Sequence, residues 1–204
     1  MKVLIVFSHP SRTKSYTSEI LRQLESSLRN ENIAYEISDL YQMNFQSDMS
    51  EEEYEREGLA NKALPIPNDV RMEHKKIESS DAIIFLYPVW WSDCPAKLKG
   101  WFDRVYSVGY AYGYNESDPI EKQNSMPRLK YGLVICTAGH PNSFLDEIGI
   151  SQSMRNVMLD DRLGKRFVKK EMLILGGTLD LEQVQQQHRE AVKEVGKKIL
   201  THCS

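Results

Sequence analysis

Short apolar runs alternate along this chain with segments in which apolar residues recur every three or four positions. The runs predict strands, and the segments between them predict helices. The run at Lys2 to Phe7 is unbroken, which is typical of a strand buried on both faces. Four further strands are predicted at Ala34 to Leu40, Asp81 to Tyr87, Lys130 to Thr137 and about Glu171 to Leu175. The weak alternation of the second strand places it nearer an edge. Strands that alternate with helices indicate a parallel sheet with both faces covered.

Amphipathic helices are predicted between the strands. The first begins near Ser15 and carries Ile20, Leu24 and Leu28 on one face. Further helical segments are predicted at Asp69 to Ser79, from Pro95 to about Arg104, in the stretch that ends at Met158, and after Asp180, where Gln183 forms a capping box. The connections at Tyr41 to Asn68 and Tyr106 to Arg128 are long and polar, as functional loops often are.

Five strands with intervening helices predict a doubly wound α/β fold, and the strand order 2-1-3-4-5 is its flavodoxin-like form. No repeat, low-complexity tract or linker interrupts the chain, so residues 1–204 are expected to form one domain. In this order the carboxyl ends of the first, third and fourth strands surround one crevice. Open α/β sheets bind their ligands in that crevice.

Charge and cysteine content exclude several classes of protein. The formal net charge of -3 argues against nucleic acid as the main partner. The three cysteines, Cys94, Cys136 and Cys203, form no CxxC pair, so neither a disulfide framework nor a metal site is expected. The apolar run at the N-terminus is too short for a signal peptide, and Ala82 to Trp91 is about half a membrane span. A soluble, cytoplasmic protein is therefore expected.

A hydroxyl-rich segment, Ser8 to Ser18, joins the first strand to the first helix and includes Arg12 and Lys14. A helix N-terminus presents unpaired N–H groups and partial positive charge, which suit a phosphate. The segment has neither G-x-x-x-x-G-K-[ST] nor G-x-G-x-x-G, so an ordinary ATPase and a Rossmann NAD site are both disfavoured. The alternative is a plain serine N-cap with no ligand.

Two further turns follow the third and fourth strands. In Pro88-Val89-Trp90-Trp91-Ser92, flat side chains stand where a planar ligand such as a flavin binds, although they are also consistent with core or interface aromatics. In Thr137-Ala138-Gly139-His140, Gly139 permits close approach of the backbone to a ligand. His140 is suited to donate to a ligand carbonyl or to relay a proton, and the alternative is a solvated loop histidine.

A longer motif connects these segments. Residues 88–105 read P-V-W-W-S-D-C-P-A-K-L-K-G-W-F-D-R-V, and A-Y-G-Y follows at 111–114. This resembles the P-x-Q-W-[FY]-x-x-P-x-x-L-K-x-W-[FIL]-[DE]-[RK]-V and A-Y-x-[YH] motifs of the flavodoxin-like NAD(P)H:quinone oxidoreductases of the DT-diaphorase type. Their bacterial relatives include drug-activity modulators and ancillary subunits of potassium efflux. Ser8-His9-Pro10 and the loop at 137–140 are similar to the family's S-H-P and T-T-G-G segments, and the resemblance covers roughly Met1 to Gly177.

The resemblance implies roles for individual residues. A flavin phosphate is expected to be held by His9, Ser15, Tyr16, Thr17 and Ser18, and the isoalloxazine ring by Pro88, Val89, Trp90, Trp91, Ser92, Thr137, Ala138, Gly139 and His140. Tyr112 and Tyr114 match aromatics that cap the substrate pocket from the partner subunit, which implies a homodimer with shared active sites. FAD is the expected flavin, with FMN as the alternative.

Four positions depart from the family pattern. Trp90 stands where Gln is common, and His140 stands where the second loop Gly is usual. Phe144 and Ile150 occupy the places of a Tyr and a His that form a charge relay in the mammalian enzymes, so that relay is expected to be absent. We hypothesise that His140 supplies the proton instead, and that Phe144 contacts the substrate.

The expected activity is that of a flavin-dependent NAD(P)H oxidoreductase. NAD(P)H gives hydride to the flavin, which passes two electrons to a quinone or similar aromatic acceptor in ping-pong order. The alternative is a regulatory flavoprotein subunit that binds a membrane transporter, because the same motifs occur in both groups. A one-electron flavodoxin carrier is disfavoured, since it predicts a more acidic surface and a phosphate loop rich in Ser, Thr and Gly.

Overall fold

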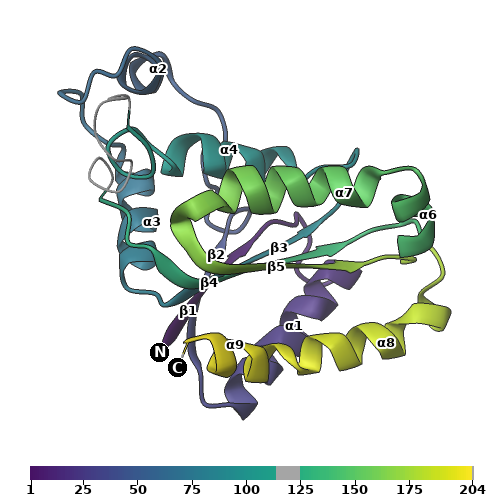
Figure 1. Ribbon diagram of the computed structural model, residues 1–204. Helices are drawn as coiled ribbons and strands as arrows, with labels where there is room; N and C mark the ends of the chain where they lie inside the picture. Colours follow the sequence, from purple (N-terminus) through teal and green to yellow (C-terminus); the bar gives the residue numbers. More distant parts are fainter. Residues whose placement is uncertain (114–124, 204) are drawn as a thin grey trace.

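A five-stranded parallel sheet forms the centre of the protein (Figure 1). The computed structural model describes residues 1–113 and 125–203. The strands are β1 (Lys2–Phe7), β2 (Ala34–Asp39), β3 (Ala82–Pro88), β4 (Leu129–Thr137) and β5 (Phe167–Leu175). They pair in parallel in the order β2-β1-β3-β4-β5, which confirms the predicted flavodoxin-like arrangement and the edge position of the second strand.

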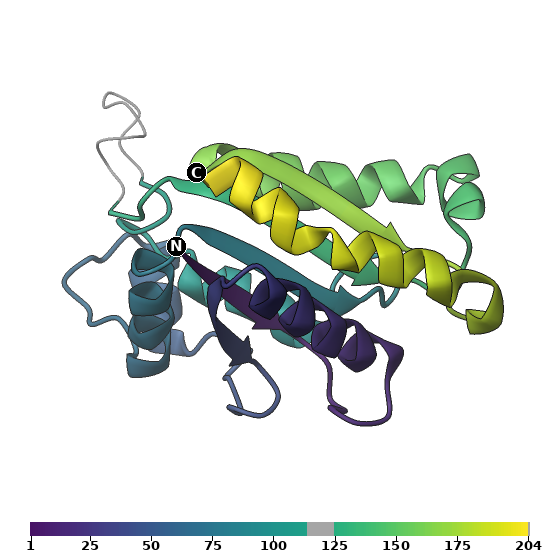
Figure 2. The same cartoon turned by 90° about the horizontal axis from the view of Figure 1, so that it is seen from below.

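Helices cover both faces of the sheet (Figures 1 and 2). One face carries α1 (Tyr16–Asn30), α8 (Leu181–Lys193) and α9 (Val195–Cys203). The other carries α3 (Asn68–Glu78), α4 (Ala96–Val105) and α7 (Ile150–Arg155), which runs on into a π-helical segment, Asn156–Leu163, and a 3-10 turn, Gly164–Arg166. The short helices α2 (Glu51–Gly58) and α6 (Asn142–Glu147) lie at opposite ends of this second layer.

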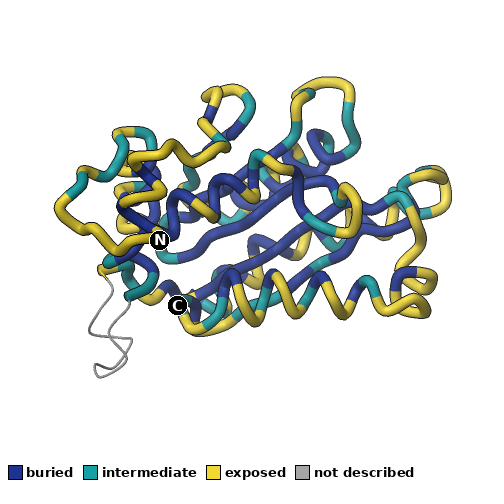
Figure 3. The backbone as a smooth tube through the Cα atoms, turned by 90° about the horizontal axis from the view of Figure 1, so that it is seen from above, coloured by how far each residue is buried: buried dark blue, intermediate teal, exposed yellow. Residues whose placement is uncertain are grey.

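The alternating side chains of the buried strands form two separate cores. In β1, Val3 and Ile5 pack into the cluster under α1 and α9, whereas Leu4 and Val6 pack into the cluster under α3 and α4. All four are fully buried, as are the residues of the neighbouring β3 (Figure 3). A strand that must be apolar on both faces produces the unbroken runs seen in the sequence.

The segment expected as a loop between β2 and α3 contains a helix, so that expectation was wrong in part. Helix α2 begins with a capping box in which the Ser50 hydroxyl accepts from the Glu53 N–H, and the Glu53 side chain accepts from the Ser50 N–H. Its buried side chains are Glu53, Arg56 and Glu57 rather than apolar residues. The helix was missed because its packing face is charged and leaves no hydrophobic period.

Three other expectations need correction. Strand β5 begins at Phe167, four residues earlier than expected, because the charged residues Lys169 and Lys170 on this edge strand obscure its first half. The last helix is interrupted at Glu194, between α8 and α9. The capping box expected at Asp180 does not form; instead the Gln183 side-chain amide donates to the Asp180 carboxylate, at 2.5 Å.

Candidate active site

The carboxyl ends of β1, β3 and β4 are joined directly by hydrogen bonds. The Ser8 N–H, just beyond β1, donates to the Leu86 carbonyl at 3.0 Å, and the Val89 N–H, just beyond β3, donates to the Thr137 carbonyl at 2.8 Å. The Thr17 and Thr137 hydroxyls lie 2.8 Å apart and connect α1 to the end of β4. The three segments that the sequence singled out therefore meet at one edge of the sheet.

The segment after β1, here called the serine loop (Ser11 to Ser18), is organised around one carbonyl group. The Ser11 carbonyl accepts from the Ser15 hydroxyl at 3.1 Å and from the Ser18 hydroxyl at 2.6 Å. Ser15 is also the N-cap of α1, and its hydroxyl accepts from the Ser18 N–H. Ser15 therefore caps the helix, and this role is compatible with an anion at the same helix end. The N–H groups of Tyr16 and Thr17 have no partner within the helix, by its geometry.

Other groups around the serine loop are fixed in place. The Nδ1 atom of His9 lies 2.9 Å from the backbone nitrogen of Ser11 and 2.9 Å from its carbonyl oxygen. Burial lowers the pKa of His9 below its ordinary value. Arg12 lies 3.3 Å from the Asp39 carboxylate and packs over Phe7. The fully buried Ser8 hydroxyl has no hydrogen-bond partner among the described residues. An unpaired hydroxyl at a strand end is consistent with a bound polar group there.

The side chain of Tyr16, within the serine loop, contacts α8. Its hydroxyl lies 3.0 Å from Nδ1 of His188 in α8, and the two rings have centroids 5.7 Å apart. The side chain of Thr17 is occupied by Thr137, as described above. Of the residues expected to hold a phosphate, these two are therefore suited to do so only through their backbone N–H groups.

The residues after β3 form a tight turn, here called the tryptophan turn (Trp90 to Asp93). Trp90 and Asp93 exchange backbone hydrogen bonds of 2.9 and 3.2 Å. The two central residues, Trp91 and Ser92, have φ values of 49° and 63°. Positive φ at both central positions is the geometry of a type I′ turn, which usually needs Gly or Asn. Backbone strain of this kind is often found at functional sites.

The tryptophan turn presents its aromatic side chains to the surface. Trp91 is 101% exposed and Trp90 43% exposed, whereas Pro88 is buried at the end of β3. The rings of Trp90 and His9 have centroids 6.3 Å apart, so the turn faces the segment after β1. The alternative of Trp90 and Trp91 as core residues of this chain is wrong. They are free to contact a ligand or a second chain.

A side chain distant in sequence contacts this turn, and no sequence pattern indicated it. Arg162, from the π-helical segment, donates to both carboxylate oxygens of Asp93, at 2.8 and 3.0 Å. The Asp93 carboxylate also accepts from the Cys94 N–H at 2.7 Å. Burial raises the pKa of the Cys94 thiol to about 12, so this cysteine stays protonated and is not a nucleophile at neutral pH. Long-range ion pairs of this kind leave no local sequence pattern.

The loop after β4, here called the histidine loop (Thr137 to His140), is anchored by its backbone. The Ala138 N–H donates to the Leu175 carbonyl, and the Ala138 carbonyl accepts from the Thr178 N–H, both at 3.0 Å. The His140 carbonyl accepts from the Gly177 N–H at 2.8 Å, while its side chain is exposed. The His140 ring lies against that of Phe144, with centroids 4.7 Å apart. These two side chains form one exposed aromatic pair beside the strand ends.

Tyr112 lies far from these strand ends. The tryptophan turn precedes α4 and Tyr112 follows it, and the ten residues of this helix rise about 15 Å. The Tyr112 hydroxyl donates to Glu57 of α2 at 3.2 Å, and Glu57 also accepts from the Val108 N–H. Tyr114 lies outside the described residues. Within one chain, Tyr112 is thus not part of the candidate site.

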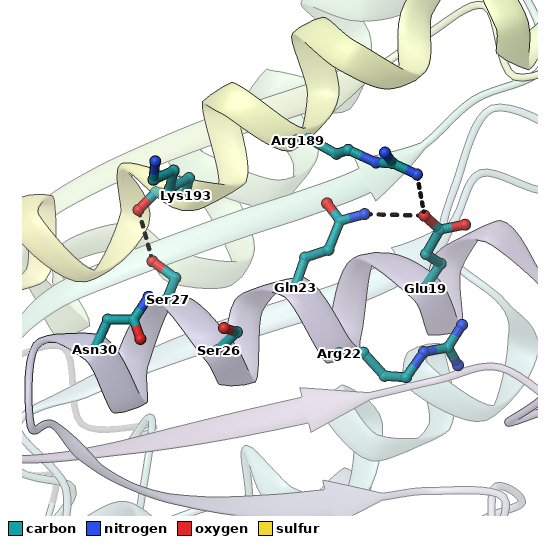
Figure 4. A pocket seen from close by; sticks show the side chains of 8 residues that line it. All are labelled: Glu19, Arg22, Gln23, Ser26, Ser27, Asn30, Arg189 and Lys193. Atoms are coloured by element: carbon teal, nitrogen blue, oxygen red, sulfur yellow. Dashed lines mark hydrogen bonds and ion pairs between the residues drawn. The ribbon is translucent and has the colours of Figure 1, made fainter.

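Two cavities lie elsewhere on the molecule. One, of about 480 Å³, is a groove between α1 and α8 lined by polar side chains, in which Glu19 pairs with Arg189 at 3.2 Å (Figure 4). The other, of about 360 Å³, lies along α4 and includes Tyr106, Tyr112 and Arg162. Residues 1–113 and 125–203 contain no cluster of His, Cys, Asp or Glu that is suited to bind a metal ion. No helix in the same ranges is long and apolar enough to cross a membrane.

Comparison with known proteins identifies the family. A family model described as the flavodoxin-like fold matches residues 1–199. The chain is 31% identical over 160 residues to an uncharacterized NAD(P)H oxidoreductase of Haemophilus influenzae, covering 78% of this chain and 75% of that protein. The structure of an NAD(P)H:quinone oxidoreductase from Methanothermobacter marburgensis has 43% identity and a TM-score of 0.87, and the match covers 99% of this chain and 98% of that one.

A more distant structure shares the fold. An FMN-dependent NADH-azoreductase from Bacillus anthracis, solved in complex with FMN, has a TM-score of 0.69 at 18% identity, over 98% of this chain and 99% of that one. The resemblance seen in the sequence motifs is confirmed by these matches. The chain belongs to the family of the flavodoxin-like fold, and its relatives in that family are named NAD(P)H oxidoreductases.

Proposed function

We propose that this protein binds a flavin at the carboxyl ends of β1, β3 and β4 and transfers two electrons from NAD(P)H to a quinone or similar aromatic acceptor. The observation that carries the proposal is the convergence of the serine loop, the tryptophan turn and the histidine loop at one edge of the sheet. The 2.8 Å bonds from Val89 to Thr137 and between Thr17 and Thr137 fix that convergence. The names of the relatives described above support the reaction.

The residues at this edge fit the parts of a flavin. The N-terminus of α1 and the neighbouring Arg12 and Lys14 supply positive potential for a phosphate, and the unpaired Ser8 hydroxyl supplies a hydrogen-bonding group. The exposed rings of Trp90 and Trp91 suit a planar heterocycle. A bound flavin supplies the chemistry of accepting and donating hydride, so the protein need only bind, orient and stabilise charge.

The histidine loop is the part of the site we assign to charge stabilisation. The Ala138 N–H is committed to the Leu175 carbonyl, so we assign donation to the pyrimidine side of the ring to the next N–H groups of this loop, those of Gly139 and His140. Fixed peptide dipoles stabilise developing negative charge without reorganisation. We assign delivery of a proton to the reduced acceptor to the His140 imidazole, which is exposed and lies beside Phe144.

We further propose that the active protein is a homodimer. Tyr112 is separated from the strand ends of its own chain by the length of α4, so it contributes to a substrate pocket only if that pocket belongs to a second copy. Trp91 is fully exposed in the single chain, which is unusual for so large an aromatic side chain. Both features are accounted for by a two-fold interface across which active sites are shared.

The test of the central proposal is a visible absorption spectrum of purified protein, followed by mass analysis of the released chromophore. We expect a bound flavin that NAD(P)H reduces and a quinone reoxidises. The mass separates FAD, which the motif resemblance favours, from FMN, which the azoreductase of the same fold binds. Protein that takes up neither flavin would overturn the proposal. Flavin binding without quinone turnover would instead favour the regulatory-subunit alternative.

A further inference from the structure

The tryptophan turn needs an external restraint. Trp91 and Ser92 both lie in the left-handed region of φ, with values of 49° and 63°. Side chains with a β-carbon disfavour this region, and no glycine or asparagine occupies either central position. The Trp90 and Asp93 backbones exchange two hydrogen bonds, but the exposed side chains of the turn add little packing. Some contact outside the turn must therefore favour this conformation over more relaxed ones.

Arg162 provides such a contact, with a geometry that only arginine supplies. Its two terminal nitrogens donate to the two carboxylate oxygens of Asp93 at 2.8 and 3.0 Å. A planar fork that meets a carboxylate in this way fixes orientation as well as distance. The same carboxylate accepts from the Cys94 N–H at 2.7 Å, so Asp93 joins the guanidinium to the backbone that leaves the turn.

The Arg162 side chain is itself held firmly. It is 9% exposed, and its guanidinium lies 5.3 Å from the centre of the Phe102 ring in α4. It also lies 3.1 Å from the sulfur of Met158, one turn earlier in the π-helical segment. π-Helical turns are rare and occur often at functional sites. The guanidinium is thus fixed by two elements before it meets the turn.

We propose that Arg162 is a positioning residue of the flavin site. Its bidentate ion pair with Asp93 holds the tryptophan turn in the left-handed conformation that presents Trp90 and Trp91 at the strand ends. The inference deepens the proposed function and rests on it, since the benefit of a fixed turn is that the aromatic rings meet the ligand without prior ordering. Preorganisation of this kind raises affinity because less conformational freedom is lost on binding.

The test compares Arg162→Lys, which keeps the charge but loses the fork, with Asp93→Asn, which keeps the shape of the acceptor. Arg155→Lys is the matched control, because Arg155 precedes the same π-helical segment but donates to the Met172 carbonyl, away from the turn. Two quantities are measured on each purified apoprotein. One is hydrogen exchange at the Trp90 and Asp93 amides, and the other is the dissociation constant of added FMN or FAD.

Both site variants are expected to lose amide protection in the turn by at least about tenfold and to bind flavin at least about tenfold more weakly than the Arg155→Lys control. The double variant is expected to be no worse than the poorer single variant, since both remove the same ion pair. Wild-type protein that binds no flavin would refute the proposed function. Wild-type protein that binds flavin, with site variants that match the Arg155→Lys control in both measurements, would refute the role of Arg162 alone.

Discussion

At the scale of single residues, the exposed side chain of His140 allows the proposed chemistry to be tested directly. The His140 backbone is held by Gly177 and its side chain is exposed, so the imidazole can be removed without disturbing the loop. We expect His140→Ala to retain flavin but to slow flavin reduction or quinone turnover by more than tenfold, within the ~10²–10⁴ that acid–base assistance supplies. Stopped-flow measurement of each half-reaction decides the matter. Rates within about twofold of wild type in both would remove His140 from the mechanism.

Two of the tryptophans, Trp91 and Trp101, allow flavin binding to be tested separately from stability. Trp91 is fully exposed, so Trp91→Ala is expected to change the free energy of unfolding by less than about 0.5 kcal/mol while weakening flavin binding about tenfold or more. Trp101 is fully buried and donates to Glu73 at 2.8 Å, so Trp101→Ala is expected to cost about 3–5 kcal/mol of stability. Urea unfolding and a flavin titration on both variants give the comparison. A Trp91 variant with unchanged flavin affinity would contradict a ligand contact by this ring.

At the scale of elements, α2 is attached to the rest of the protein by charge rather than by apolar packing. Arg104 of α4 is buried and pairs with Glu53 of α2 at 2.6 Å and with Asp69 of α3. We expect Arg104→Met to lower the free energy of unfolding by about 3–5 kcal/mol, because it leaves a buried carboxylate uncompensated. Hydrogen exchange in α2 should rise with it.

The pair of Lys99 and Asp103, on the exposed side of the same helix α4, provides the control. Exposed pairs contribute little, so Lys99→Met is expected to change stability by less than about 1 kcal/mol. An equal loss from both substitutions would mean that α2 does not depend on the buried ion pairs.

Whether an element packs through apolar or through charged side chains explains whether the sequence predicts it. The strands β1, β3 and β4 are largely apolar, and their order follows from the alternation with helices, so both were predictable. Helix α2 and the first half of β5 were not, because charged residues occupy the positions that would carry a hydrophobic period. The positions of the serine loop, tryptophan turn and histidine loop were predictable because strand ends meet in this fold. The left-handed turn and the Arg162–Asp93 pair depend on contacts between residues distant in sequence.

At the scale of the whole molecule, three half-buried or buried histidines, His9, His74 and His188, make stability depend on pH. Burial is the largest cause, and it lowers the pKa of each below 6.5. The His74 ring is stacked on Tyr110, with the Val105 carbonyl and Glu73 working to raise its pKa and Arg56 to lower it. Because the unfolded chain then binds more protons, stability is full above about pH 6.5 and falls as pH drops below that value.

The measurement is urea unfolding at about pH 7.5 and about pH 5.5, for wild type and His74→Gln. We expect the wild type to lose stability at the lower pH and the variant to lose less, since one of the three titrating groups is gone. A variant with the same loss as wild type would show that His74 does not contribute to the pH dependence.

The proposed homodimer predicts that two inactive variants recover turnover when they are expressed together. Suppose that Trp91→Ala and Tyr112→Ala each abolish most turnover, the first through the strand-end site and the second through the loop after α4. In a homodimer with shared sites, a heterodimer of these variants has one site with both residues intact and one with neither. Co-expression in equal amounts gives about half heterodimers, each with one of two sites working, so turnover should recover to about a quarter of wild type. If Tyr112 acts within its own chain, every site carries a defect, and turnover stays at the level of the single variants.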